Sequence, residues 1–318
     1  MRELLYARLA APGLSHRVPC GRRALADGVE LPAAPPNPAP VTHVTAEGVR
    51  IHRVQTGWVS VKQRFREMRG PAFLRVTAIV TDTSWTEWLP ITFYVIEHPE
   101  GTLVFDTGET AKTSQPDYFD CDPGTRWFYL NQLRFAVAPE DELGPQLESL
   151  GINPGDVRWA VLSHLHSDHM GGMGWLSGAE FLVSDTDADG HRGALMCRLP
   201  PGIKTTRVTY PDGPMGAFEK SARITSDGNL GIVSTPGHTP GHQSVLYLEN
   251  ETFYFFAGDV VFDLERLENE TALAGIVEQV PSARRSISRV EQQVTAFRTI
   301  LLPAHDANTT APGRFRTD

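Results

Sequence analysis

The stretch WAVLSHLHSDHMGGMG, residues 159–174, decides how this chain folds. Its first four residues are continuously apolar, which is typical of a short buried strand. Four candidate metal ligands follow that strand within six residues: His164, His166, Asp168 and His169. The first two histidines leave an extended chain on the same side, whereas Asp168 and His169 fall where the chain turns into a helix and can serve a second ion. Because imidazole and carboxylate groups suit a borderline cation such as zinc, the stretch predicts a metal site at a strand end.

Composition excludes several classes of protein. The chain has 318 residues, of which 41% are hydrophobic and 21% charged, as in ordinary soluble globular proteins, and its length allows a sizeable core. The formal net charge of −9 disfavours a nucleic-acid partner, because phosphate binding needs clustered lysine and arginine. No apolar stretch approaches the length of a membrane span. We therefore expect a globular protein that binds neither nucleic acid nor membrane.

The three cysteines, Cys20, Cys121 and Cys197, are odd in number and widely separated. They show no CxxC spacing, so we expect neither a disulfide nor a metal-binding role for them. Such cysteine usage fits a reducing compartment, which predicts a cytoplasmic location.

Residues 1–40 differ from the rest of the chain. The first 26 residues are rich in arginine but lack the continuous apolar core of a secretory signal, and an organelle transit peptide remains an alternative. Residues 31–40, LPAAPPNPAP, are too rich in proline for a helix or a central strand. We predict a flexible arm over 1–40 and one folded domain over 41–318.

Runs of apolar residues predict the remaining elements. Strands are expected at 49–54, 73–81, 91–97, 103–105, 180–184, 253–257 and 300–302, with several short strands within 203–234. Helices are expected over 139–150 and 283–300. Residues 112–138 indicate a loop or short helices, whose aromatic side chains pack on the body or line a substrate mouth. Because strands precede helices in each half, we predict an α+β fold with two similar layers packed face to face.

Three further positions repeat the pattern of a ligand placed just after an apolar strand. They are His238, Asp259 and His305. No local motif links them, because 69, 21 and 46 residues separate the successive ligands from His169 onward. Together with the first cluster they make seven ligands, which is enough for two metal ions.

In this arrangement the chain resembles the metallo-β-lactamase superfamily. The matching elements stand in the expected order: the DTG of 106–108, the HxHxDH of 164–169, the PGHTPGH of 236–242, the GD of 258–259 and His305. The resemblance implies an αββα sandwich with a dinuclear metal site at one edge, so that residues 41–318 form a hydrolase domain.

The resemblance also implies the role of each site residue. One ion would bind His164, His166 and His238, the other would bind Asp168, His169 and His305, and Asp259 would bridge them. The family pattern makes Asp106 a residue that orients the site and His242 a structural hydrogen-bonding residue. Asp168 and Asp259 are the candidate catalytic carboxylates. The expected cofactors are two divalent metal ions, taken to be Zn²⁺.

Within the superfamily the chain is most similar to N-acyl homoserine lactone lactonases. The similarity extends to Trp88-Leu89-Pro90, to ITFYVIEHPEGTLVFDTG at 91–108 and to HTPGHQS at 238–244. It implies a small-molecule lactone substrate, whose ring a metal-bridging hydroxide opens, and a homodimer. The candidate substrate contacts are Trp85, Trp88, Trp127 and Phe262, with ordinary packing as the alternative for the tryptophans.

One position departs from the lactonase pattern. Those enzymes commonly have a tyrosine three residues after the bridging aspartate, where this chain has Phe262. A phosphotriesterase similar to methyl parathion hydrolase and a general esterase or lactonase therefore remain alternatives. A non-catalytic metal-binding protein that uses the arm for docking is a third.

Overall fold

A computed structural model describes residues 32–67, 72–115, 117–268 and 273–307. The fold described below is that of the described residues from Ala34 onward, which belong to one compact unit. Most of the predicted arm, residues 1–31, lies outside the described residues, and residues 32–40 form neither helix nor strand. The division into an arm and a domain stays a prediction.

The first sheet has eight strands and carries the metal-site stretch. Its order is β1-β2-β3-β4-β6-β7-β8, with β5 paired to the far end of β2. Neighbours from β1 to β4 run antiparallel, whereas β4, β6, β7 and β8 run parallel. The strands are β1 Val41–Val44, β2 Arg50–Val61, β3 Leu89–His98, β4 Gly101–Phe105, β5 Leu133–Ala136, β6 Val157–Val161, β7 Glu180–Ser184 and β8 Lys204–Val208.

The second sheet has five strands in the order β13-β12-β11-β10-β9. These are β9 Ser221–Arg223, β10 Leu230–Ser234, β11 Gln243–Glu249, β12 Thr252–Gly258 and β13 Thr299–Pro303. β13 runs parallel to β12, and the other pairs are antiparallel. Asn250 and Glu251 join β11 to β12 with positive φ angles of 47° and 67°, the conformation that matches a tight hairpin to the twist of its strands.

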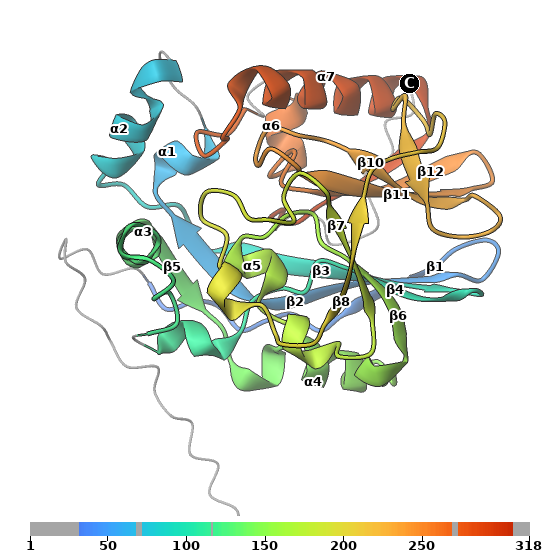
Figure 1. Ribbon diagram of the computed structural model, residues 1–318, viewed down its shortest axis with the longest axis horizontal. Helices are drawn as coiled ribbons and strands as arrows, with labels where there is room; N and C mark the ends of the chain where they lie inside the picture. The colour runs from blue at the N-terminus through green and yellow to red at the C-terminus, as the bar shows by residue number, and fades with distance from the viewer. Residues whose placement is uncertain (1–31, 68–71, 116, 269–272, 308–318) are drawn as a thin grey trace, which may run out of the picture. The chain divides into compact units, whose positions relative to one another are not determined.

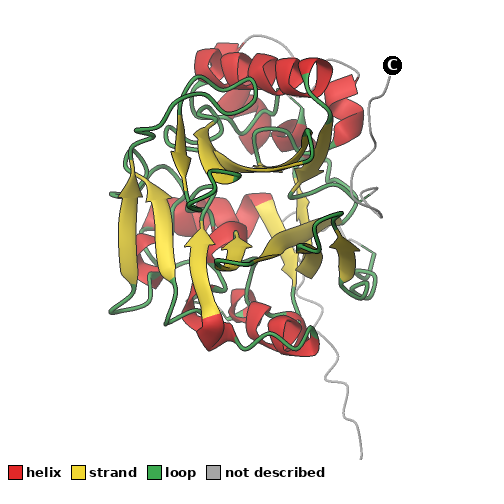
Figure 2. Ribbon diagram, turned by 90° about the vertical axis from the view of Figure 1, so that its right-hand side faces the viewer, coloured by secondary structure: helices red, strands yellow, loops and turns green. Residues whose placement is uncertain are grey.

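Helices cover the outer faces of both sheets (Figures 1 and 2), so the domain is an αββα sandwich. α4 packs on the first sheet, and α6 and α7 pack on the second. The helices are α1 Gln63–Arg66, α2 Arg75–Val80, α3 Pro123–Gln132, α4 Leu143–Ser149, α5 Ser167–Met170, α6 Leu264–Glu268 and α7 Val280–Ala296. The predicted α+β fold is therefore confirmed.

Successive side chains of a strand point to opposite faces of the sheet, and this alternation builds the core. Phe256 on β12 faces the first sheet and meets Tyr94 edge-on, with ring centroids 5.2 Å apart. Its neighbour Phe255 faces the opposite way and packs with Val290 of α7. All three aromatic rings are buried, and each contributes about 2–3 kcal/mol from burial alone. This core fixes the strand ends from which the site residues project.

One predicted strand is wrong. Residues 73–81 form a 3₁₀ turn, Ala72–Leu74, followed by the helix α2. The β-branched residues suggested a strand, but the adjoining edge of β2, Trp58–Val61, pairs with β5 instead. Without a pairing partner the segment coils over the end of the sheet, where only Ile79 of α2 is buried. Strand β11 was not predicted, and the helix expected from residue 139 begins with a 3₁₀ turn, Pro139–Asp141.

The expectation that no disulfide forms is also wrong. Cys121 and Cys197 are joined, with Cα atoms 5.5 Å apart, whereas Cys20 lies outside the described residues. The bond ties the start of α3 to the 3₁₀ turn Met196–Arg198. The separation of 76 residues explains why no local spacing revealed it. Since disulfides are uncommon in reducing compartments, the predicted cytoplasmic location loses this support and remains a prediction.

Removing this disulfide is expected to destabilise the protein. A cross-link between residues 76 apart restricts the unfolded chain, which corresponds to about 4 kcal/mol. The double variant Cys121→Ser/Cys197→Ser should therefore unfold at a temperature lower by on the order of 10 °C. Thermal unfolding followed by circular dichroism measures this, and dithiothreitol should lower the transition of the wild type but not that of the variant. Equal transitions for the oxidised wild type and the variant would contradict the expectation.

None of the described helices is both long enough and apolar enough to cross a lipid bilayer.

Candidate metal centre

The seven predicted ligands come together at one edge of the sandwich, where strands of both sheets end. His164 and His166 follow β6, and Asp168 and His169 lie in α5. The other three follow β10, β12 and β13: His238, Asp259 and His305. Their ligand atoms form three groups, each within 4.8 Å: His164/His166/His238, His164/His169/Asp259 and Asp168/His169/His305.

The first group consists of three imidazoles whose nitrogens face one another. His166 Nδ1 lies 2.8 Å from His164 Nε2 and 3.0 Å from His238 Nε2. Burial lowers the pKa of His166 to about 4 and also lowers the pKa of His164 and of His238, so the rings are neutral. Neutral imidazole is the form that binds a metal ion. One shared proton cannot satisfy three converging nitrogens, whereas a cation among them can.

The second group combines carboxylates with imidazoles, and Asp259 faces both groups. Asp259 Oδ1 lies 3.4 Å from His169 Nε2 and 3.3 Å from His305 Nε2, while its Oδ2 lies 3.4 Å from His238 Nε2. Asp168 Oδ2 lies 3.6 Å from His305 Nε2. Among the described residues, His169 Nε2 and Asp259 Oδ1 are buried without a hydrogen-bond partner. Such orphaned atoms fit a site built to hold cations.

Residues behind the ligands fix their orientation. Asp106 Oδ2 accepts a hydrogen bond of 2.8 Å from His169 Nδ1, and its Oδ1 accepts one of 2.7 Å from the Ser163 amide. His305 Nδ1 donates to the Pro90 carbonyl at 2.8 Å. In both histidines Nε2 is left facing the carboxylates, which is the usual arrangement behind a metal ligand.

His242 takes a supporting place rather than a ligand position. The Asp259 amide donates to His242 Nε2 at 3.0 Å, and His242 Nδ1 lies 2.8 Å from Thr235 Oγ1. Both ring nitrogens are therefore occupied, and burial lowers the pKa of the ring to about 3. The residue anchors the backbone that carries Asp259.

Sequence reasoning missed a second supporting cluster. Its members are Asp187 and His191, which lie in the polar turn after β7. His191 Nε2 accepts a hydrogen bond of 3.1 Å from the Leu165 amide, between two ligands. Asp187 Oδ1 accepts one of 2.6 Å from the Gly241 amide, next to His242. The turn thus ties the 164–169 segment to the 236–242 segment, a long-range contact that leaves no local sequence signal.

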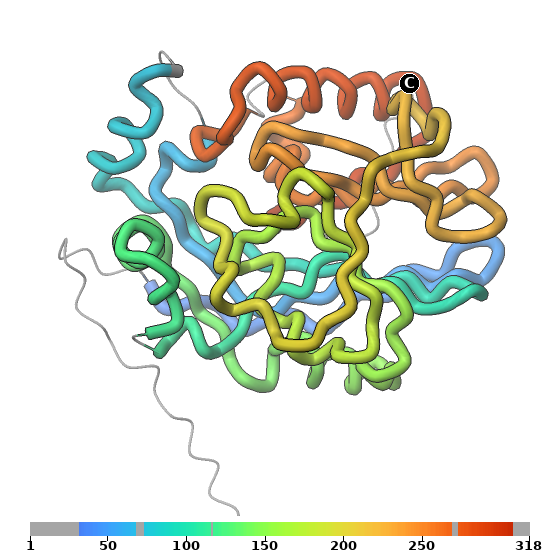
Figure 3. Tube along the Cα trace, viewed as in Figure 1, coloured from blue at the N-terminus to red at the C-terminus, as the bar shows by residue number. Residues whose placement is uncertain are grey.

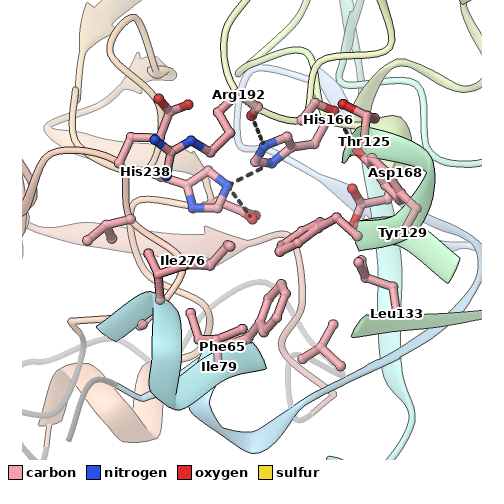
Figure 4. A pocket seen from close by; sticks show the side chains of 18 of the residues that line it. Phe65, Ile79, Thr125, Tyr129, Leu133, His166, Asp168, Arg192, His238 and Ile276 are labelled. Carbon is pink, nitrogen blue, oxygen red and sulfur yellow. Dashed lines mark hydrogen bonds and ion pairs between the residues drawn. The ribbon is translucent and has the colours of Figure 1, made fainter. Parts of the chain in front are cut away.

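An apolar cavity of about 430 Å³ opens onto the candidate ligands (Figure 4). His166, Asp168 and His238 face one end of it, while Phe65, Ile79 and Leu133 lie across from them. α1 and α3, distant in sequence, lie side by side here, as Figure 3 shows, and Phe65 of α1 meets Phe128 of α3 at a centroid distance of 5.4 Å.

Of the four predicted substrate contacts, two line the cavity and two do not. Trp127 and Phe262 line it, and Phe262 lies over the ligands, with its ring 5.4 Å from that of His305. Trp85 and Trp88 are not among the lining residues. Trp85 packs instead beneath Lys62, whose Nζ lies 3.8 Å from the indole centroid. The structure thus brings only Trp127 and Phe262 to the site.

Glu109, which the sequence analysis did not single out, is fully buried behind the DTG turn. Its Oε1 accepts hydrogen bonds from the Thr110 amide and the Tyr118 hydroxyl, at 2.9 and 3.2 Å. Burial raises the pKa of this carboxyl from 4.5 to about 8. The folded protein therefore holds a proton that the unfolded chain releases.

The buried carboxyl predicts a pH dependence of stability. As the pH rises from 4.5 to about 8, the folded state keeps the proton while the unfolded state loses it, so the free energy of unfolding falls. The loss attributable to Glu109 amounts to at most about 5 kcal/mol above pH 8. In urea unfolding at pH 5 and pH 9, Glu109→Gln should be stabilised relative to the wild type at pH 9 only. The exposed Glu148→Gln is the matched control, and a wild type and Glu109→Gln that lose stability in parallel would contradict the assignment.

Comparisons with known proteins agree with this geometry. The family model described as "Metallo-beta-lactamase superfamily" matches residues 86–305. The chain is 28% identical over 229 residues to the N-acyl homoserine lactonase AttM of Agrobacterium fabrum, covering 69% of this chain and 82% of that protein. It is 30% identical over 227 residues to the N-acyl homoserine lactonase AiiA of Bacillus thuringiensis subsp. kurstaki, with the same coverage.

A solved structure supports the fold. It is an N-acyl homoserine lactone hydrolase with the product N-hexanoyl-L-homoserine bound at its catalytic metal centre. The two structures superpose with a TM-score of 0.65 at 21% identity, over 84% of this chain and 97% of that one.

Proposed function

Because the chain belongs to the metallo-β-lactamase superfamily, we propose that it is a metal-dependent hydrolase that opens the lactone ring of N-acyl homoserine lactones. The observation that carries this proposal is the convergence of seven histidine and aspartate side chains at the end of an apolar cavity. The relatives, whose alignments cover 69% of this chain, are named for that activity.

The donor set suits two divalent ions, which we propose to be Zn²⁺. His164, His166 and His238 would hold one ion, and Asp168, His169 and His305 would hold the other, with Asp259 between them. When bound, such ions polarise the ester carbonyl and lower the pKa of water towards neutrality. Asp106 would keep His169 aligned through their hydrogen bond of 2.8 Å.

Asp259 is the proposed proton carrier. Burial alone would raise the pKa of this carboxyl, but His305, His169 and His238 hold it well below its usual range, so the group is ionised. Water attacks the lactone carbonyl carbon, the ring carbon–oxygen bond breaks, and Asp259 passes one proton of the water to the ring oxygen. The second proton leaves to solvent as the new carboxyl group ionises. The product is an N-acyl homoserine, with a carboxylate and a free hydroxyl. Asp168, whose Oδ2 also lies near His305 Nε2, at 3.6 Å, would stabilise the same cluster.

The walls of the cavity suit an acyl chain. Trp127 and Phe262 are the proposed contacts from the predicted set, together with Phe65, Ile79 and Leu133. An alkyl chain buried against these apolar side chains would gain roughly 0.8 kcal/mol of binding free energy per CH₂ group removed from water. A homodimer, which the family resemblance implies, stays a prediction.

A substrate panel tests the proposal. We expect the zinc-loaded protein to open N-hexanoyl homoserine lactone with a kcat/KM at least 100-fold above that for an aryl ester or a phosphotriester, in a pH-indicator assay. His166→Ala should be inactive, and His43→Ala, on the edge strand β1, is the matched control. Preferential turnover of the ester or the phosphotriester would overturn the lactonase assignment. A metal-loaded protein inert towards all three would favour the non-catalytic alternative.

A further inference from the structure

Two arginines interrupt the apolar wall of the cavity. Arg75 lies in α2, and Arg192 follows the His191 turn. Figure 4 shows Arg192 beside His166, whose Nε2 donates to the Arg192 carbonyl at 3.1 Å. The backbone of Arg192 is therefore fixed next to the candidate ligands, and both arginines are among the residues that line the cavity.

Neither guanidinium group has a polar partner among the described residues. Within the ranges that the structure describes, the side chains of Arg75 and Arg192 form no hydrogen bond and no ion pair, and Arg75 Nη1 is buried. A buried donor without an acceptor is costly, and a guanidinium group carries five donors. Arg75 therefore has an unused donor in the cavity wall, while Arg192 is exposed, so its donors are open to solvent and to a ligand.

Outside the ligand set, the acidic residues of the cavity wall are Asp122 and Glu278, and Glu278 Oε1 is buried without a hydrogen bond. Asp122 caps α3 by accepting hydrogen bonds of 2.9 Å from the amides of Gly124 and Thr125. Glu278 Oε1 lies 3.4 Å from His191 Nδ1, and no ion pair joins Glu278 to either arginine in the described part of the chain. The charge of Glu278 attracts Arg75, but no carboxylate among the described residues forms an ion pair with either guanidinium group.

The two arginines also influence each other. Burial lowers the pKa of Arg75 and the positive charge of Arg192 lowers it further, while the negative charge of Glu278 acts in the opposite direction. Like charges that face one cavity repel unless an anion lies between them, and planar guanidinium groups match the oxygens of a carboxylate in pairs. The geometry therefore favours a ligand that carries such a group.

We propose that Arg75 and Arg192 form a carboxylate-binding subsite, which recognises an acidic group on the acyl part of the substrate, remote from the ester bond. This inference rests on the proposed function and narrows its substrate class. The preferred substrates are lactones or esters whose acyl chain ends in a carboxylate, with the ester at the metal centre and the apolar wall around the chain.

A matched pair of substrates tests the subsite. N-hexanoyl homoserine lactone and its analogue with a six-carbon acyl chain ending in a carboxylate differ only at the chain end. We expect the wild type to favour the acidic lactone at least 10-fold in kcat/KM, because hydrogen bonds between charged groups are strong. This preference should fall about 10-fold in Arg75→Gln and in Arg192→Gln. It should also fall with added salt, since screening weakens charge interactions.

Two further variants complete the design. Arg284→Gln removes an equal charge from the exposed face of α7 and should keep the preference. Arg75→Lys retains the charge without the planar fork and should keep only part of it, which reports on the subsite even if Arg75→Gln fails to fold.

The two proposals fail in different ways. A wild type that opens both lactones equally well, or arginine variants that keep the preference, would overturn the subsite and leave the lactonase assignment intact. Loss of the proposed function itself would appear as no turnover of either lactone by the zinc-loaded wild type. A stronger preference for an acyl chain that ends in phosphate would mean that the subsite binds an oxyanion other than a carboxylate, which would overturn the proposed substrate class.

Discussion

Replacing Asp259 by asparagine is expected to lower kcat for lactone opening by at least about 10³-fold, since general acid–base catalysis alone contributes 10²–10⁴-fold. The carboxylate faces both ligand groups, with Oδ1 3.3 Å from His305 Nε2 and Oδ2 3.4 Å from His238 Nε2. Asparagine has the same size but carries neither the charge that would join two cations nor a site for the proton. Steady-state kinetics, with the bound metal measured on the same samples, tests this.

Asp156→Asn is the matched control for that substitution. Asp156 is exposed in a 3₁₀ turn before β6, so the variant should keep the wild-type kcat. An Asp259→Asn variant that binds two metal ions and keeps more than a tenth of the wild-type kcat would show that this carboxylate does not carry the proton.

Removal of the metal is expected to abolish activity and to destabilise the fold. The ligand cluster buries Asp168 and Asp259 among histidines, and a cation that binds only the folded state stabilises it by about 4 kcal/mol at 1,000 times its dissociation constant. Dialysis against a chelator should therefore lower the unfolding temperature by roughly 10 °C and remove lactone hydrolysis. Two equivalents of Zn²⁺ should restore both properties.

The control for chelation is the same chelator saturated with Zn²⁺ beforehand, which should change neither property. Full activity in a preparation with less than one tenth of a metal ion per chain would contradict the metal-dependent account.

The sequence predicts those parts of the molecule that depend on short-range pattern. The buried strand at 159–162 is confirmed by β6, and the amphipathic run at 283–300 by α7. Each further candidate ligand was expected directly after an apolar run, and the structure brings these strand ends to one edge. A buried strand requires a run of apolar residues, and the rigid end of such a strand can hold a metal ligand in place. The strand and the ligand that follows it can therefore both be recognised in the sequence.

Features set by contacts between distant segments could not be predicted. Residues 73–81 have the composition of a strand, yet β5 occupies the only pairing edge that β2 offers there. Cys121 and Cys197 meet because α3 and the turn at Met196–Arg198 pack together, which no spacing rule encodes. Arg192 gained its position in the cavity in the same way, through the fold of the turn that carries His191.

Stepwise reconstitution of the apoprotein with Zn²⁺ tests the central claim most directly, with bound metal and opening of N-hexanoyl homoserine lactone measured on each sample. The account predicts that lactone opening reaches its full rate at two bound ions per chain, with a product heavier than the lactone by one water. A protein that holds two ions and leaves the lactone closed would contradict it.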